Sequence, residues 1–317
     1  MLPSGINNPR HIYCSLKPAT WHYSLHPQFN KIEDFPYQAN YVDINGAKVH
    51  YVDEGAGEVI LCLHGEPSWS YLYRKFIPVL SKGHRIIAPD FIGFGKSDKY
   101  DKMSDYSFRL HFDTLVAFIE KLSLKDINLV VQDWGGFIGL SVLGAYPELF
   151  KRVVIMNTYL PIGDRPMPLA FKVWRTFARL HPNLPIGFIM KMGSYKRESK
   201  KQSVLDAYKA PFPSGKYKAG TKAFPMLVPM KSDDPGVVEM KKARDVLSKW
   251  NKPALVMFSD KDPIMGGAVH FFRKLIPTTS DQPKITIRNA GHFLQEDSGE
   301  EIATHIEAFI KGELTAS

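Results

Sequence analysis

Asp133 is the residue whose type and position point most directly to chemistry. It lies between an apolar run at residues 129–131 and the pair Gly135 and Gly136. This order predicts a strand that turns sharply into a helix, because glycines lack the side chains that would hold the two apart. An aspartate of ordinary pKa, about 3.9, is ionised at neutral pH and forms an ester of its own side chain when it attacks. That chemistry suits displacement at an sp³ carbon, whereas the alternative is that Asp133 only caps the helix.

Two further candidate residues follow predicted strands later in the chain. Asp262 comes after the apolar run 254–258, and His292 comes after the run 284–287. Open α/β sheets hold their sites at the carboxyl ends of strands, so these side chains should meet Asp133. A histidine of ordinary pKa, about 6.5, would be largely neutral at pH 7 and could take a proton from water while Asp262 holds its other nitrogen. Asp260 is the rival acid, and we favour Asp262 because a proline follows it.

Two backbone N–H groups are expected to face the nucleophile. Glu66 belongs to the sequence His-Gly-Glu-Pro directly after the apolar run 59–63, and Trp134 follows Asp133. N–H groups at these two positions form an oxyanion hole in enzymes that carry a nucleophile on such a turn. Here they would bind the ester oxygen when water attacks it.

The elements that must position these residues alternate between strands and helices. An Asn-Gly turn predicts a hairpin at 41–51, and further strands are expected at 59–63, 85–90, 129–132, 152–157, 254–258 and 284–287. Helices are expected at 108–122, from 134 to near Pro147, and at 237–250, 268–276 and 300–314. This alternation predicts an α/β fold with a mostly parallel sheet that is covered by helices on both faces.

The segment 158–230 differs from the rest, since prolines divide it into short helical stretches and it contains no convincing strand. We therefore expect a core domain made of residues 1–157 and 231–317, with an irregular leader at 1–36. The segment 158–230 is expected to form a helical cap domain over the sheet.

The amino-acid composition of the chain argues against several classes of function. The chain has 317 residues, 44% hydrophobic content, a formal net charge of +9 and two cysteines. The lysines are spread from Lys172 to Lys252 and beyond, not gathered in one dense block, and no nucleic-acid motif accompanies them. We therefore expect a solvated basic surface and no nucleic-acid or membrane partner. Cys62 should be a buried thiol, and the cysteines allow no zinc site, so no metal or cofactor is expected. Without an apolar run of about 18 residues or a secretion signal, a cytoplasmic protein is expected.

Several motifs together resemble the haloalkane dehalogenases. They are His-Gly-Glu-Pro-Ser-Trp-Ser-Tyr-Leu-Tyr-Arg at 64–74, Val-Gln-Asp-Trp-Gly-Gly at 131–136, Ala-Tyr-Lys-Ala-Pro-Phe-Pro at 207–213 and Lys-Ala-Phe-Pro at 222–225. The chain is most similar to the subfamily with His-Gly-Glu and an acid after the seventh strand. The resemblance extends from about residue 40 to the C-terminus. It implies an α/β-hydrolase fold with an eight-stranded sheet and an inserted cap.

The resemblance also implies a reaction and further site residues. Asp133 would displace halide from a small halogenated hydrocarbon, and His292 backed by Asp262 would activate water to hydrolyse the ester. Two indole N–H groups bind the halide in this family; they map onto Trp134 and, in the cap, Trp174. Family positions that line the pocket match Phe137, Phe171, Phe224 and Pro225. We expect a monomer. The cap segment before Trp174 is shorter than in the best-known member of the subfamily, so the volume of the pocket and the preferred chain length of the substrate stay open.

Two other functions remain open on the sequence alone. An epoxide hydrolase would use the same Asp–His–Asp set but needs an acid for its oxygen leaving group, normally two cap tyrosines; the candidates are Tyr159, Tyr195, Tyr208 and Tyr217. Trp174 and Glu66 favour halide instead. A hydrolase-like protein without activity would bind a ligand under its cap without turnover, whereas a serine esterase would require serine at position 133.

Overall fold

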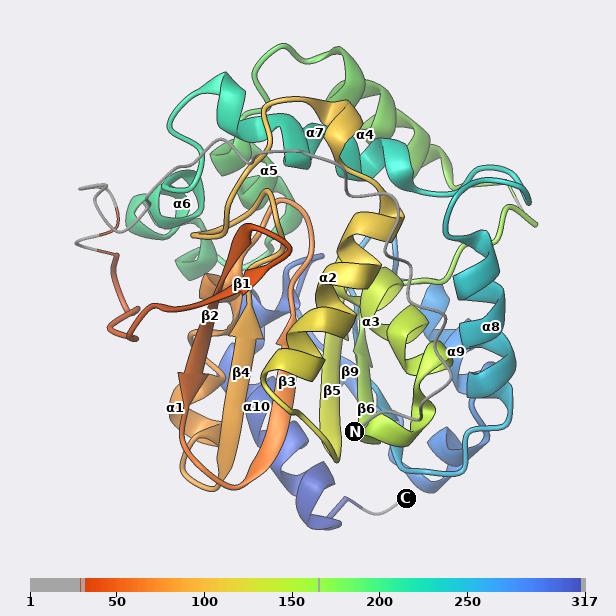
Figure 1. Ribbon diagram of the computed structural model, residues 1–317. Coiled ribbons are helices and arrows are strands. Elements are labelled where there is room, and N and C mark those ends of the chain that lie inside the picture. The colour runs from red at the N-terminus through yellow and green to blue at the C-terminus, as the bar shows by residue number, and fades with distance from the viewer. Residues whose placement is uncertain (1–28, 30–31, 165, 315–317) are drawn as a thin grey trace.

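The computed structural model describes residues 29, 32–164 and 166–314 (Figure 1). Most of the predicted leader therefore lies outside the described residues. The predicted alternation of strands and helices is confirmed over the rest of the chain, and the elements form a central sheet with helices on both faces.

Seven strands form the main sheet, in the order β1-β2-β4-β3-β5-β6-β7. The pairs β1–β2 and β2–β4 are antiparallel, and the remaining neighbours are parallel. The predicted hairpin is the β1–β2 pair, which turns at Asn45 and Gly46, both with positive φ. The strands are β1 (Asn40–Ile44), β2 (Ala47–Glu54), β3 (Glu58–Leu63), β4 (His84–Pro89), β5 (Ile127–Gln132), β6 (Phe150–Met156) and β7 (Ala254–Val256).

The expected eight-stranded sheet is divided in the structure. The predicted strand 254–258 is interrupted at Met257, and a separate two-stranded parallel sheet follows, made of β8 (Phe258–Ser259) and β9 (Thr286–Ile287). Asp262 and His292 both follow strands of this small sheet. The small sheet therefore brings the two predicted residues together at one edge, as parallel pairing requires.

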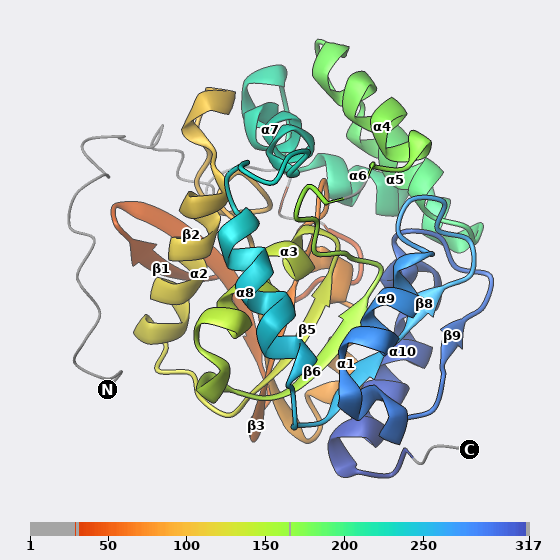
Figure 2. The same ribbon diagram turned by 90° about the vertical axis from the view of Figure 1, so that its right-hand side faces the viewer.

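Two layers of helices cover the sheet (Figures 1 and 2). One layer contains α2 (Phe108–Lys121), α3 (Trp134–Ala145) and α8 (Val237–Ser248), which pack on one another, and α9 (Ala268–Leu275) lies beside α8. The other contains α1 (Ile77–Leu80) and α10 (Leu294–Lys311). Short 3₁₀ helices lie between these elements at Ser70–Tyr73, Met103–Asp105, Pro147–Leu149, Glu198–Lys200, Gly215–Lys218 and Pro277–Asp281.

The helix predicted from Glu300 is preceded by one further turn at 294–297, and a kink at Ser298 separates the two inside α10. Ser298 has non-helical angles inside α10, and with Gly299 it resembles a helix start in the sequence. Residues 294–299 are nevertheless buried. Their contacts with the rest of the protein hold the extra turn, and no local pattern encodes such contacts.

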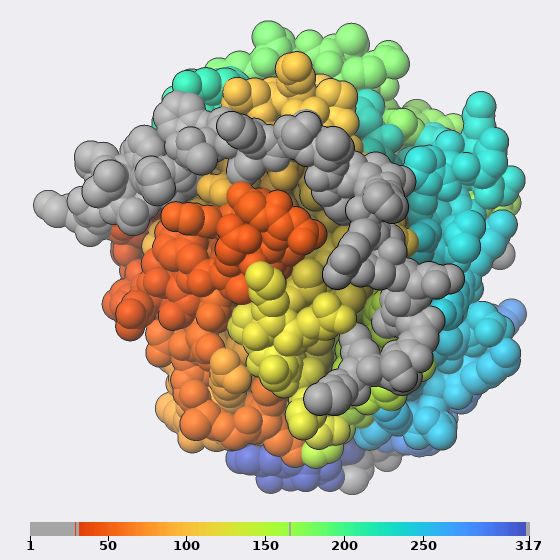
Figure 3. Space-filling view, in the orientation of Figure 1, coloured from red at the N-terminus to blue at the C-terminus, as the bar shows by residue number. Residues whose placement is uncertain are grey.

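The cap helices lie above the carboxyl ends of the strands, at the top of Figures 1 and 3. They are α4 (Leu169–Leu180), α5 (Ile186–Gly193), α6 (Gln202–Lys209) and α7 (Ala219–Leu227). No strand occurs in the described part of 158–230. No helix in the described ranges has the length and apolar character needed to cross a membrane.

Candidate active site

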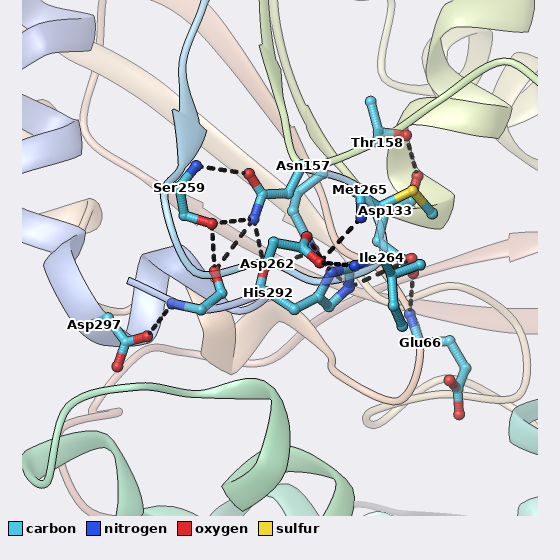
Figure 4. Close-up of polar contacts among 12 residues, drawn as sticks. Glu66, Asp133, Asn157, Thr158, Ser259, Asp262, Ile264, Met265, His292 and Asp297 are labelled. Carbon is cyan, nitrogen blue, oxygen red and sulfur yellow. Dashed lines mark hydrogen bonds and ion pairs between the residues drawn. The ribbon is translucent and has the colours of Figure 1, made fainter. Parts of the chain in front are cut away.

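Asp133 occupies a strained turn between β5 and α3. Its φ is 51° and its ψ is −125°, a conformation that residues with a side chain rarely adopt. Its carboxylate makes no capping hydrogen bond to α3. Instead the backbone N–H of Glu66 donates to Asp133 Oδ1 at 2.8 Å, and Thr158 Oγ1 donates to the Asp133 carbonyl at 2.6 Å (Figure 4). The structure thus favours a carboxylate held for chemistry over a helix cap.

Two glycines allow this turn to lie so close to its neighbours. A Cβ added to Gly135 would overlap the Leu63 carbonyl, and one added to Gly65 would overlap the Asp133 carboxylate. Backbone atoms can approach a reacting group this closely only where no side chain intervenes. The expected close packing of strand and helix through the glycine pair is therefore confirmed at Gly135.

His292 lies between two carboxylates. Its Nδ1 is 2.8 Å from Asp262 Oδ2, and its Nε2 is 3.5 Å from Asp133 Oδ2 (Figure 4). Asp262 Oδ1 accepts backbone N–H bonds from Ile264 at 2.8 Å and Met265 at 3.0 Å. The rival Asp260 instead accepts from the Ala290 N–H at 3.3 Å. The three predicted side chains thus meet in the order needed for a nucleophile, a base and an acid that orients the base.

The expectation that His292 is largely neutral at pH 7 is wrong for the resting site. Burial alone would lower the pKa of His292, but the Asp262 carboxylate, together with a hydrogen bond to Asp133, raises it to about 10. Burial likewise favours the neutral form of Asp262, yet contact with His292 holds the Asp262 pKa below its ordinary value. His292 is therefore an imidazolium between two carboxylates in the resting site. The spacing of residues in the sequence does not reveal how such neighbouring charges shift each other's pKa.

Gln132 is a site neighbour that the sequence analysis missed. Its Nε2 donates to the His292 carbonyl at 3.2 Å and lies 3.1 Å from His292 Nε2. The side chain is fully buried at the end of β5, directly before the nucleophile. Its place beside Asp133 in the sequence was the one available signal.

Asn157 was also missed, and it holds the loop that carries His292. Its Nδ2 donates to Ser259 Oγ at 2.7 Å, to the Gly291 carbonyl at 3.2 Å and to the His292 carbonyl at 3.3 Å. Its Oδ1 accepts the Ser259 N–H at 3.0 Å. Because Asn157 directly follows β6, it ties the end of that strand to the His292 loop.

Asp297 is a third residue that sequence reasoning missed. Its Oδ2 accepts the Gly291 N–H and the Tyr195 N–H, each at 2.8 Å. Its Oδ1 accepts the Lys196 N–H and the Ser199 hydroxyl, again at 2.8 Å. One buried carboxylate therefore joins the His292 loop to the cap segment that follows α5.

A cavity of about 710 Å³ opens beside Asp133 and is lined mainly by apolar side chains. The core contributes Glu66, Asp133, Trp134 and His292, and the cap contributes Trp174. Further lining residues are Phe137, Leu169, Ala170, Phe171, Val173, Phe177, Phe188, Ile189, Met192, Gly193, Pro225, Val228, Pro263, Ile264, Met265 and Phe293. Both predicted indoles thus face one apolar space that contains the carboxylate.

Three of the four predicted pocket residues line this cavity, namely Phe137, Phe171 and Pro225. The prediction for Phe224 is wrong. Its ring is fully buried and packs against the Trp134 ring, with a centroid distance of 4.5 Å. Phe224 precedes Pro225 in α7, and neighbouring helical residues point in different directions, so only one of the two reaches the cavity.

None of the four candidate cap tyrosines lines the cavity. The Tyr208 hydroxyl donates to Glu296 Oε1 at 2.5 Å, and the Tyr159 hydroxyl accepts from Arg244 at 3.3 Å. Tyr195 is half exposed. The acid that an epoxide hydrolase needs is therefore not supplied by these side chains.

Glu66 has a different environment from the other acids of the site. Burial, together with the nearby Asp133 charge, raises its pKa well above the ordinary value. This shift favours the neutral form of the Glu66 side chain, which adds no second negative charge beside Asp133. Within the described ranges, no cluster of three or more His, Cys, Asp or Glu residues could hold a metal ion.

Comparison with known proteins gives consistent matches over most of the chain. Residues 58–299 match the family model of the alpha/beta hydrolase fold. A haloalkane dehalogenase from Mycolicibacterium paratuberculosis is 45% identical over 287 residues, which cover 88% of this chain and 94% of the relative. One from Psychrobacter cryohalolentis is 43% identical, covering 89% and 95%. The solved structure of the tetrameric haloalkane dehalogenase DpaA from Paraglaciecola agarilytica is 38% identical, with a TM-score of 0.83 and coverage of 88% and 94%.

Proposed function

The chain belongs to the haloalkane dehalogenases, α/β-hydrolases that act on carbon–halide bonds, and we propose which of its side chains carry each step of that reaction. The observation that carries the proposal is the Asp133 carboxylate on its strained turn, 3.5 Å from His292 and at the wall of an apolar cavity. A nucleophile, a base and a dry substrate site are then in one place.

In the first step, Asp133 attacks the carbon that bears the halogen. A carbon–oxygen bond forms, the carbon–halogen bond breaks, and the halide leaves with the bonding electrons. Its growing negative charge requires donors in a site that excludes water. Trp134 and Trp174 both line the cavity, so we assign their indole N–H groups to this task.

In the second step, His292 acts as the base. Esterification removes the Asp133 charge, and with it one of the causes that raise the pKa of His292. The His292 imidazolium can then release its proton to solvent, and the neutral imidazole takes a proton from a water molecule, whose oxygen attacks the ester carbonyl carbon. The Glu66 N–H, 2.8 Å from Asp133 Oδ1, holds the developing oxyanion. On collapse, the proton taken from water passes to the departing alkoxide, which leaves as the alcohol. The proton of the Asp133 carboxyl group returns to His292, which restores the carboxylate and the resting imidazolium.

A cytoplasmic monomer is proposed as the form in which the enzyme works. Cys62 is a free, buried thiol, in keeping with a reducing compartment. Segment 158–230 contains thirteen Lys and Arg residues but three Asp and Glu, so two caps would repel each other. The solved relative from P. agarilytica is a tetramer, which is the alternative. Native mass spectrometry of the purified protein distinguishes a monomer from a tetramer.

The assignment of Asp133 is tested by halide and proton release from short bromo- and chloroalkanes, with an epoxide panel beside it. The wild type is expected to release halide, and Asp133→Ala is expected to lose this activity by at least about 10³-fold, because the displacement has no nucleophile. Halide release that persists in Asp133→Ala contradicts the assignment. Diol formation from epoxides without halide release points to the other hydrolase class.

Trp174→Phe should separate halide binding from packing. Phenylalanine keeps the ring in the cavity but removes the N–H donor, so we expect the alkylation step to slow by about 10²-fold. Halide should also quench tryptophan fluorescence more weakly. The matched control is Phe177→Leu, which alters the same wall of the cavity without removing a donor. Equal rates in Trp174→Phe and the wild type would return Trp174 to a packing role.

A further inference from the structure

Exposed apolar side chains are concentrated on the cap. Of the eight large hydrophobic residues that are exposed in the described part of the chain, six lie on α4, on α5 or directly after α5. We call these six the apolar crest: Leu169, Val173, Leu180, Phe188, Met192 and Tyr195. Leu169 is 76% exposed and Leu180 and Met192 are each 68% exposed, so the crest is not covered by other described parts of the chain.

The crest lies at the outer end of the molecule and is continuous with the active-site cavity. In Figures 1 and 2, α4 is the outermost cap helix, farthest from the sheet. Four crest residues, Leu169, Val173, Phe188 and Met192, also line the cavity beside Asp133. An apolar molecule entering or leaving along this side therefore passes over the crest.

Positive charge surrounds the crest. The thirteen basic and three acidic residues of 158–230 give this segment a formal charge of +10, while the whole chain carries +9. The charge excess of the protein thus resides in the cap. Lys172 and Arg179 on α4 and Lys191 on α5 are exposed beside the apolar side chains. Amphipathic helices with this composition lie in the interface of anionic bilayers.

We propose that the apolar crest, with its flanking basic residues, docks on the surface of an anionic lipid bilayer, from which the enzyme takes apolar substrate. The crest inserts into the headgroup region, and Lys172, Arg179 and Lys191 pair with lipid phosphates. The inference rests on the proposed function in one respect: haloalkanes are apolar and dissolve in lipid. It revises the expectation of no membrane partner, which was based on the lack of one dense block of lysines in the sequence.

A second copy of the chain fits this surface less well than lipid. A symmetric contact through the crest would bring the same basic side chains of two copies together, and like charges at close range oppose association. Phosphate headgroups supply the opposite charge, and the acyl boundary accepts the apolar side chains. Lipid therefore complements both properties of the surface.

The test is sedimentation of the purified enzyme with sucrose-loaded vesicles, without any haloalkane present. Vesicles of phosphatidylcholine with phosphatidylglycerol are compared with vesicles of phosphatidylcholine alone. The variant K172E/R179E/K191E should bind the anionic vesicles at least about 100-fold more weakly, because each basic residue near such a surface contributes about fivefold in affinity and the introduced glutamates add repulsion. K82E/K241E/K274E makes the same charge change at exposed lysines outside 158–230 and is expected to bind like the wild type.

A second variant tests the apolar part. Leu180→Ser replaces a crest residue that does not line the active-site cavity, and we expect about tenfold weaker binding with unchanged turnover of a short, dissolved bromoalkane. That turnover also shows that each variant is folded. Wild-type enzyme that does not sediment with anionic vesicles, or charge variants that bind alike, would overturn the proposal. Crest variants that only change the native mass would assign the surface to a second copy instead. Vesicle binding does not require turnover. If only the dehalogenase assignment fails, the enzyme releases no halide but still binds anionic vesicles.

Discussion

Mixed with a bromoalkane, the His292→Gln enzyme is expected to gain the mass of one alkyl group and then stop. Asp133 can still displace bromide, because that step needs no base. Water cannot then be activated, so the ester remains, and steady-state turnover should fall by at least about 10³-fold. Glutamine retains a polar side chain next to Gln132 and Asp262, so the loop loses little of its packing.

Intact-protein mass spectrometry and a bromide assay measure the two halves of this result. One bromide per enzyme should appear in a single burst, together with the mass gain. The double variant Asp133→Ala/His292→Gln is the control and should show neither. If folded His292→Gln enzyme gains no mass, the nucleophile is not Asp133. If it turns over repeatedly, another group serves as the base.

Glu296→Gln is expected to destabilise the protein by about 3–5 kcal/mol, the range typical of a buried ion pair that loses one partner. The Glu296 carboxylate in α10 accepts hydrogen bonds from Nη1 and Nη2 of Arg74 and from the hydroxyl of Tyr208 in α6. Arg74 is itself buried and lies over the Tyr71 ring. A glutamine amide would turn N–H donors toward the guanidinium and leave its charge without a counterion.

Urea unfolding at pH 7 measures this effect. The matched control is Asp245→Asn, which breaks the exposed pair with Lys249 and should cost less than about 1 kcal/mol. Burial opposes the charge of Arg74, but Glu296 and its hydrogen bond raise the Arg74 pKa further above its already high value, so Arg74 stays charged throughout the accessible pH range. A loss in Glu296→Gln no larger than that of Asp245→Asn would show that Arg74 finds other partners.

The sequence predicts best what local patterns determine. The positions of β5, α3 and the turn at Asp133 follow from an apolar run and two glycines, and the ends of β8 and β9 place Asp262 and His292. The identity of the acid needed only the order of residues in one loop. These signals lie within about ten residues of each side chain, so no knowledge of distant contacts was required.

What the sequence did not reveal depends on contacts between distant segments. The turn at 294–297, before the kink in α10, is held by buried side chains that meet the cap and the core, and this turn places Glu296 and Asp297. The raised pKa of His292 depends on two carboxylates 30 and 159 positions away in the chain. Phe224 is an apolar aromatic residue of the kind that lines pockets, but the rotation of α7 places its ring against the Trp134 ring instead of in the cavity.

The four bonds to Asp297 also determine how the cap can move. Raising the cap beside Tyr195 would strip a buried carboxylate of three donors at once, and it would loosen Gly291 next to the base. This border of the cap therefore resists opening. We infer that this border stays closed while the alcohol and the halide leave, so that His292 keeps its place for the next turnover.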